Sequence, residues 1–212
     1  SAGESVSYDM YQIILLSLVN GMGVDSINAR VYCSVLLTIS GCFGNCVANA
    51  SQVIVGYLVG AGLNDEADRR VKKYLWISVP MAIGIASLNW LLSPYTLRLF
   101  TDSSGAIEIA RNVLIVCILL EAGRSMNMIV INSMKAAGYV RFPFLVGLCT
   151  MWIIGLGFGS LAGVGLGWGV VGIFLGTALD EFVRGIIVTI RWYSQKWRGK
   201  AIAQKKPNEV EA

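Results

Sequence analysis

Residues 31–64 read VYCSVLLTISGCFGNCVANASQVIVGYLVGAGLN, and none of these 34 residues is Asp, Glu, Lys or Arg. Two further uncharged runs follow, at residues 74–97 and 142–179. A helix needs about 20 mostly apolar residues to cross the hydrocarbon core of a bilayer. The last run has 38 residues, enough for one span, a glycine-rich turn and the start of another. The runs therefore predict a polytopic helical membrane protein, whose function concerns what crosses a membrane.

The composition agrees with a membrane protein. Hydrophobic residues make up 55% of the 212 residues and charged residues 14%, whereas a soluble domain averages about 25% charged residues. The net charge of +4 does not indicate nucleic-acid binding, because the basic residues flank the apolar runs instead of forming one patch. We expect membrane lipid as a partner and no nucleic acid. The chain starts at Ser1 without an initiator Met, and we expect it to be a piece of a longer protein.

The pattern predicts an all-α fold, a six-helix membrane bundle within residues 1–195. The expected spans are residues 4–22, 31–60, 74–97, 106–137, 142–162 and 169–194. The charged stretch at residues 65–73 is expected to lie in a loop, and residues 196–212 to form a polar cytoplasmic tail. Trp192 and Trp197 are expected at the membrane–water interface, where aromatic side chains are enriched.

The basic residues predict the orientation. Of the 17 lysines and arginines, 12 fall on one side of the bundle, in the gaps at 61–73 and 135–141 and near the C-terminus. Arg30, Arg98 and Arg111 fall on the other side. Cytoplasmic loops carry the excess of Lys and Arg, so we expect a multi-pass protein of the plasma membrane, such as a bacterial inner membrane, with a cytoplasmic C-terminus.

Pairs of glycines four residues apart predict close helix packing. Such small-xxx-small spacing lets two backbones approach each other within a membrane. The three pairs are Gly56 and Gly60, Gly155 and Gly159, and Gly172 and Gly176.

The first candidate site is in the first span. A charge inside a membrane span costs a few kcal/mol or more, and it normally faces the protein interior or a water-filled cavity. Glu4, Tyr8 and Gln12 recur every four residues and share one helix face, with Asp9 next to them. A carboxylate beside a phenol and an amide can bind a cation or a proton. The alternative is that Glu4 stabilises a helix start at the water boundary.

The second candidate site is in the fourth span, where Glu121, Arg124, Asn127 and Asn132 form a polar stripe. Glu121 and Arg124 are three residues apart and can form an ion pair. A polar stripe through an apolar helix is what a transport pathway requires. The alternative is a structural pair that fixes the position of the helix.

The third candidate site is in the sixth span and comprises Asp180, Glu181 and Arg184. Arg184 can reach back to either acid. The cluster is expected nearer the cytoplasmic end, so simple exposure to water is the alternative to a functional role.

The sequence offers no catalytic constellation. The chain has no His, so acid–base chemistry would fall to carboxylates or Tyr. It has no P-loop that would indicate ATP as the local energy source. We therefore predict no enzyme activity, no metal site and no cofactor, other than a coupling ion.

Several stretches resemble one transporter family. Residues 121–138, EAGRSMNMIVINSMKAAG, with VRFP at 140–143, resemble the tenth helix and next loop of multidrug and toxic compound extrusion (MATE) transporters. Residues 48–62, ANASQVIVGYLVGAG, resemble the eighth helix, and residues 2–5 resemble part of the seventh. The resemblance extends from residue 1 to about residue 200.

The resemblance implies a twelve-helix protein of two six-helix lobes, of which this chain is the C-terminal lobe and the N-terminal lobe its partner. The family exports small organic, often cationic, compounds in exchange for Na⁺ or H⁺. Some members carry an acid in the seventh helix, about one turn after the position of Glu4, and another in the tenth helix. Arg124 stands at the second position, with Glu121 one turn before it, so a Glu–Arg pair replaces the lone acid. A lipid-linked oligosaccharide flippase and a non-transporting scaffold subunit remain the alternative functions.

Overall fold

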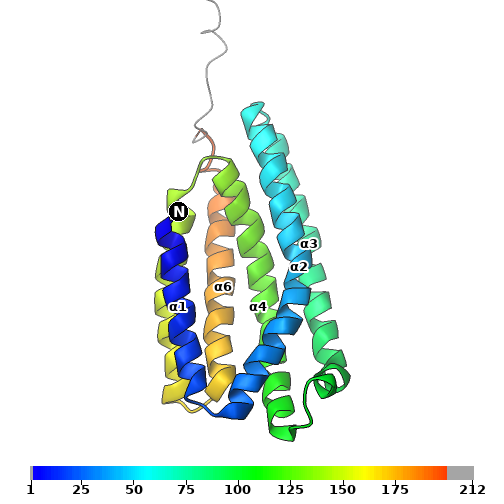
Figure 1. Cartoon of the computed structure of the whole chain (residues 1–212). Coiled ribbons are helices and arrows are strands. Elements are labelled where there is room, and N and C mark those ends of the chain that lie inside the picture. The colour runs from blue at the N-terminus through cyan, green and yellow to red at the C-terminus, as the bar shows by residue number, and fades with distance from the viewer. Residues whose placement is uncertain (1, 200–212) are drawn as a thin grey trace, which may run out of the picture.

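The computed structural model describes the backbone of residues 2–199 and the side chains of residues 6–199. Figure 1 shows the helices lying side by side, joined by short turns at the two ends of the bundle. The helices are α1 (Ala2–Asn20), α2 (Val24–Gly60), α3 (Asn64–Thr96), α4 (Ser104–Ala136), α5 (Arg141–Thr150) and α6 (Gly169–Tyr193). A 3-10 turn, η1 (Leu97–Leu99), follows α3, and two π-helical segments, η2 (Met151–Phe158) and η3 (Leu161–Gly165), continue α5. Residues 2–199 contain no strand, which confirms the all-α expectation.

Four helical segments are long and apolar enough to cross a membrane, by length and composition. They are Val24–Gly60, Asn64–Leu99, Ser104–Ala136 and Arg141–Gly165. α6 is not among them, and it carries four charged residues: Asp180, Glu181, Arg184 and Arg191. The prediction of a helical membrane bundle is confirmed.

α4 is the central helix of the bundle. It packs against α2, α3 and α6, and Figure 1 shows it between α6 and α2. Four of its polar residues are nearly fully buried. Among them, Glu121 and Asn127 have the longest side chains. These two polar groups in the middle of α4 are therefore largely removed from the surface of the bundle.

The backbones of α4 and α6 touch at two glycines. A Cβ atom on Gly123 would lie 2.5 Å from the backbone nitrogen of Phe182. A Cβ on Gly185 would lie 3.0 Å from the carbonyl oxygen of Gly123. No larger residue fits Gly123 without moving one helix, so this contact fixes the spacing of α4 and α6.

Two of the three predicted glycine pairs face each other across α6 and the π-helical continuation of α5. A Cβ on Gly176 would lie 2.4 Å from Cα of Gly159, and a Cβ on Gly172 would lie 2.6 Å from the carbonyl carbon of Ala162. The prediction is wrong for the third pair. A Cβ on Gly56 would meet only ordinary contacts, with Ala136 at 3.8 Å, and Gly60 has nothing within 4 Å.

The charged stretch after α2 is helical, not a loop as expected. α3 begins at Asn64, and the turn between α2 and α3 is confined to residues 61–63. Glu66 forms ion pairs with Arg69 and Arg70, and Asp68 accepts a hydrogen bond of 2.6 Å from Lys72. Pairs three and four residues apart stabilise a helix, and acids near its N-terminus add to this. Likewise, α2 begins at Val24, earlier than the expected residue 31.

The chain after α6 folds back on the start of α3. Trp192 and Trp197 are fully buried and stacked with ring centroids 4.3 Å apart, so the prediction of interfacial anchors is wrong. The indole of Trp192 donates a hydrogen bond of 2.9 Å to Asp68, and Arg198 pairs with Asp65 at 2.6 Å. The remainder of the expected tail, residues 200–212, lies outside the described residues.

Polar side chains separate two apolar clusters. The buried part of one cluster ends at Leu37 of α2 and Leu120 of α4, and that of the other begins at Ala48 and Ile129. Between the two clusters lies a set of polar residues at mid-length of the bundle. We call it the polar layer; it comprises Ser40, Glu121, Arg124, Ser125, Asn127, Thr150, Asp180, Glu181 and Arg184.

The glycine contact between α4 and α6 predicts a position-specific effect on stability. Gly123→Ala should destabilise the protein by about 1–3 kcal/mol, because the added methyl group overpacks the contact. Gly44→Ala is the matched control, since nothing lies within 4 Å of a Cβ on Gly44. It should be neutral, or stabilising by up to about 1 kcal/mol through the helix preference of Ala.

Thermal unfolding of the purified protein in detergent, followed by size-exclusion chromatography, measures both variants. Equal melting temperatures for the two variants would contradict the close contact at Gly123.

Candidate functional site

The first ion pair of the polar layer lies within α4. Nη1 of Arg124 is 2.8 Å from Oε1 of Glu121, which confirms the predicted pair. The carboxylate is almost fully buried, whereas 29% of the Arg124 side chain is exposed. α2 leaves room for the pair at Gly41, where a Cβ would lie 3.7 Å from the guanidinium and 3.8 Å from the carboxylate. The pair is thus held against α2 and opens on one side.

The second ion pair lies within α6. Arg184 pairs with Asp180, and its Nε donates a hydrogen bond of 3.2 Å to the hydroxyl of Thr150 on α5. The Asp180 side chain is almost fully buried and 14% of the Arg184 side chain is exposed, which does not favour the alternative of simple exposure to water. Asp180 lies near the middle of α6, because this helix runs from Gly169 to Tyr193.

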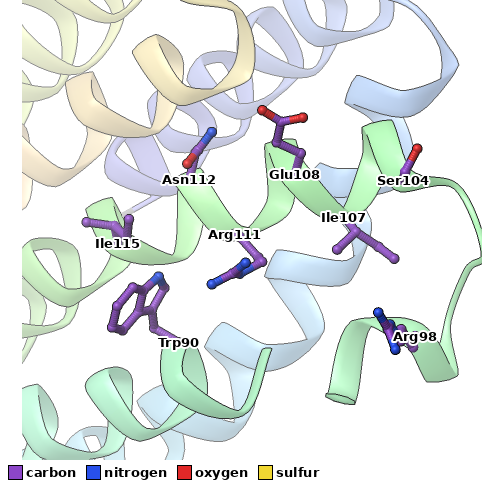
Figure 2. A pocket seen from close by; sticks show the side chains of 8 residues that line it. All are labelled: Trp90, Arg98, Ser104, Ile107, Glu108, Arg111, Asn112 and Ile115. Carbon is purple, nitrogen blue, oxygen red and sulfur yellow. The ribbon is translucent and has the colours of Figure 1, made fainter. Parts of the chain in front are cut away.

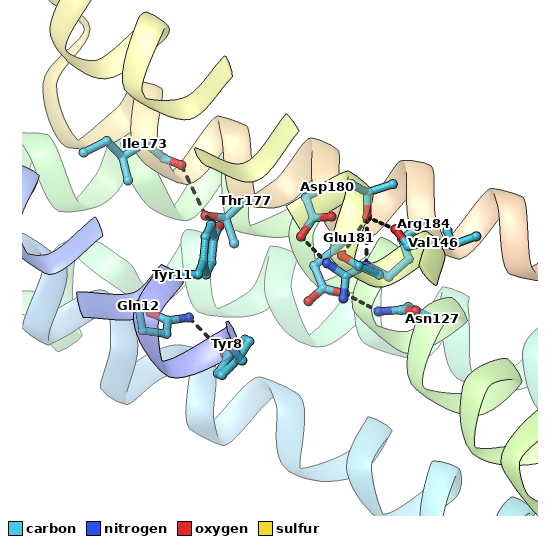
Figure 3. A network of polar contacts seen from close by, with 12 residues as sticks. Tyr8, Tyr11, Gln12, Asn127, Val146, Ile173, Thr177, Asp180, Glu181 and Arg184 are labelled. Carbon is cyan, nitrogen blue, oxygen red and sulfur yellow. Dashed lines mark hydrogen bonds and ion pairs between the residues drawn. The ribbon is translucent and has the colours of Figure 1, made fainter. Parts of the chain in front are cut away.

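A hydrogen bond joins the second and third candidate sites into one network. Nδ2 of Asn127 on α4 donates to Oε2 of Glu181 on α6 at 2.6 Å, as Figure 3 shows. The residues are 54 positions apart in the chain, and no local spacing pattern relates them. They meet because α4 and α6 touch one helical turn away, at Gly123 and Gly185.

Only part of the first candidate site lies near the network. Gln12 donates a hydrogen bond of 2.9 Å to the phenol of Tyr8, so these two residues share a face as predicted. Asp9 is exposed on another face of α1. The side chain of Glu4 lies outside the described residues, so its role stays a prediction. A further link from α1 to α6 is the hydrogen bond of 3.1 Å between Tyr11 and Thr177.

A cleft of about 570 Å³ runs along the network between α1, α2, α4 and α6. At the polar layer it is lined by Arg124, Asn127, Glu181 and Arg184, and Tyr8 lines it from α1. Asn132 and Lys135 line it further along α4. A smaller cavity of about 140 Å³ shares Arg124 and reaches Gln12 and Arg30. The two spaces give the buried charges access to the surface of the bundle.

Neutral polar residues of α2 and one glycine also line the cleft, and the sequence analysis did not identify them. Ser34, Thr38, Gly41 and Asn45 all line it. Their spacing of four, three and four residues places them on one helix face. That spacing could have indicated a polar helix face. It was missed because residues 31–64 carry no charge, and the candidate sites were chosen by their charged residues.

The network leaves acceptor atoms and negative charge unsatisfied. Oδ1 of Asn127 and Oδ1 of Asp180 are buried without a hydrogen-bond donor among the described residues. The polar layer contains three carboxylates, Glu121, Asp180 and Glu181, but two guanidinium groups. The described residues include no group of three or more His, Cys, Asp or Glu side chains suited to a metal ion. The free acceptor atoms are chemically suited to a positively charged ligand.

Comparison with known proteins finds one family. The MatE family model matches residues 1–161. "Uncharacterized transporter YisQ" of Bacillus subtilis is 35% identical over 203 residues, which cover 96% of this chain and 45% of the relative. "Probable multidrug resistance protein NorM" of Deinococcus radiodurans is 26% identical over 161 residues, covering 73% of this chain and 36% of the relative. The Pseudomonas aeruginosa protein of the same name is 23% identical, covering 74% and 33%.

The chain thus spans less than half the length of the curated relatives it matches. No solved structure gives a significant match.

The geometry predicts that Glu121 and Arg124 depend on each other. Glu121→Gln or Arg124→Ala leaves one partner in the polar layer without its counter-charge, and each change should cost about 1–3 kcal/mol of stability. The double variant should be less destabilised than the sum of the two, with a coupling of about 1 kcal/mol or more. A double-mutant cycle on thermal stability in detergent measures the coupling. Strict additivity would show that the two charges do not interact.

Proposed function

The chain belongs to the MatE family of transporters, and we propose that it forms one lobe of a secondary transporter that exports small organic cations in exchange for Na⁺ or H⁺. The observation that carries the proposal is the polar layer, which places charged groups at mid-depth of an apolar bundle and beside a cleft. Ionisable groups inside a membrane are costly and usually mark an ion or substrate pathway. Transporters built from repeated halves bind substrate and coupling ion near the membrane midplane, between the halves.

Glu181 is the carboxylate best suited to carry the coupling ion. Glu121 and Asp180 each have an arginine partner within their own helix. Glu181 accepts a hydrogen bond from the neutral amide of Asn127, and it lines the cleft. Glu181 thus has no ion pair of its own among the described residues, although Arg184 lines the same cleft. Binding of a proton or Na⁺ would remove the cost of that charge, which makes occupancy favourable when the cleft is closed to water.

Tyr8 and Glu181 supply the chemistry for an organic cation. Half of the Tyr8 side chain is exposed, on α1, and it lines the same cleft as Glu181. A tyrosine ring attracts a cation over its face, and the attraction grows when water is excluded. A cation and a coupling ion would then compete for the negative charge of Glu181, and such competition is the basis of exchange.

A second lobe completes the proposed transporter. The chain covers 45% of its relative from Bacillus subtilis, so a second bundle of similar size fits the length of the relatives. The cleft is open to the surface of this bundle, and the second lobe would form its opposite wall. The "multidrug resistance" in the names of two relatives favours a broad range of substrates.

The proposal predicts that Glu181→Gln abolishes ion-coupled export without loss of folded protein. Gln removes the charge but keeps an oxygen that can accept the hydrogen bond from Asn127. The complete transporter, reconstituted into proteoliposomes, is tested for movement of a fluorescent organic cation driven by an imposed pH or Na⁺ gradient. Gradient-driven transport should fall at least tenfold, while the yield in the membrane stays normal.

Asp102→Asn is the matched control. Asp102 is an exposed acid in the loop between η1 and α4 and does not line the cleft, so transport should be unchanged.

Full transport by Glu181→Gln with unchanged ion dependence would refute the role of Glu181. Transport that persists after both gradients collapse would refute ion coupling. A wild-type protein that leaves the cation in place but changes glycan precursors in cells would be a flippase, and one that does neither would be a scaffold.

A further inference from the structure

A separate cavity of about 360 Å³ lies at the N-terminal end of α4. It is formed by the last turns of α3, by η1 and by the first turns of α4. Its polar lining consists of Trp90, Arg98, Ser104, Glu108, Arg111 and Asn112, which Figure 2 shows. The charge distribution predicts that this end faces away from the cytoplasm.

The cavity carries two positive charges from two different elements. Arg98 belongs to η1 and Arg111 to α4. Neither forms an ion pair within residues 6–199. Glu108 also lines the cavity, but Figure 2 shows its carboxylate pointing away from Arg111, to the opposite side of α4. Both guanidinium groups are therefore available to a ligand.

The position of these arginines is informative, because the outer end has few basic residues. Of the 17 lysines and arginines in the chain, the charge pattern places three at this end, and two of the three line this one cavity. Guanidinium groups bind oxyanions such as phosphate through paired hydrogen bonds. Two arginines from separate elements in the wall of one cavity supply the residue type that recognises such an anion.

A neutral donor, the indole of Trp90, also lines the cavity. Ser104 and Asn112 are further lining residues, and Figure 2 shows them on the same side of α4 as Glu108. Nε1 of Trp90 is buried without an acceptor among the described residues. Buried donors almost always have a partner, so this indole also favours an acceptor bound at the site. Ile107 and Ile115 make the rest of the wall apolar, which suits a ligand with both an anionic and an apolar part.

We propose that this cavity binds a phosphate-type anion, either the headgroup of an acidic phospholipid in the outer leaflet or a free phosphate compound. The cavity lies at the end of two helices long and apolar enough to span the membrane, the level at which lipid headgroups are found. The site is separate from the cleft at the polar layer, with which it shares no lining residue.

The test measures binding by the complete protein in neutral detergent, through native mass spectrometry and thermal stabilisation. Phosphatidylglycerol, phosphatidylcholine and inorganic phosphate are titrated separately. Phosphatidylglycerol should bind and stabilise, and phosphatidylcholine should not. Arg98→Gln and Arg111→Gln should each weaken phosphatidylglycerol binding about fivefold, and the double variant about twentyfold or more. If inorganic phosphate alone stabilises the wild type and the double variant abolishes this, the anion comes from solution.

Arg141→Gln is the matched control. Arg141 is an exposed arginine at the opposite end of the bundle, the first residue of α5, and its loss should leave binding unchanged. Trp90→Phe keeps the ring and removes the indole donor, and it should weaken binding several-fold. The proposal is overturned if the double variant binds every probe as the wild type does. It is also overturned if Arg141→Gln causes an equal loss, since the effect would then follow net charge.

Discussion

The contact of the α4 and α6 backbones at Gly123 and Gly185 is the constraint on which the site depends. Because a Cβ on Gly123 would lie 2.5 Å from the backbone of Phe182, the two helices are as close as their main chains permit. Helices that approach this closely bring side chains one turn away within hydrogen-bond range. Asn127 and Glu181 are such a pair, at 2.6 Å. Their hydrogen bond, in turn, unites two charged clusters on separate helices in one network.

The apolar clusters on both sides of the polar layer give that network its energetic character. Buried residues of one cluster end at Leu120 of α4, and those of the other begin at Ile129. A charge between two such clusters has little access to water except through the cleft, so each charge needs a partner in the protein or in the cleft. Two of the three carboxylates form ion pairs with arginines. The third, Glu181, faces the cleft, where an ion or a cationic substrate can reach it.

The sequence predicted the fold class, the six helices and the Glu121–Arg124 pair, because each of these follows from local patterns. Uncharged runs reveal spans, and a spacing of three residues reveals a pair on one helix face. The prediction failed at one place where a local pattern was overlooked, and at others where contacts between residues distant in the sequence decide the structure. Residues 65–73 were expected in a loop because they are charged, yet their ion pairs at helical spacing extend α3. Trp192 and Trp197 were expected at the membrane surface, but they are buried against each other. The link between Asn127 and Glu181 depends on helix packing, which no local pattern encodes.

The distribution of bonds within and between helices bears on how the proposed exchange could work. The Glu121–Arg124 and Asp180–Arg184 pairs each lie within one helix, so they persist when one helix moves relative to another. The Asn127–Glu181 hydrogen bond joins two helices, and its strength depends on the charge of Glu181, because hydrogen bonds to an ionised acceptor are roughly twice as strong as neutral ones. Protonation or Na⁺ binding at Glu181 would therefore weaken a contact between α4 and α6 while leaving each helix intact. A ligand can shift a conformational equilibrium only through such a difference in interaction between two states, and our proposal assigns that difference to Glu181.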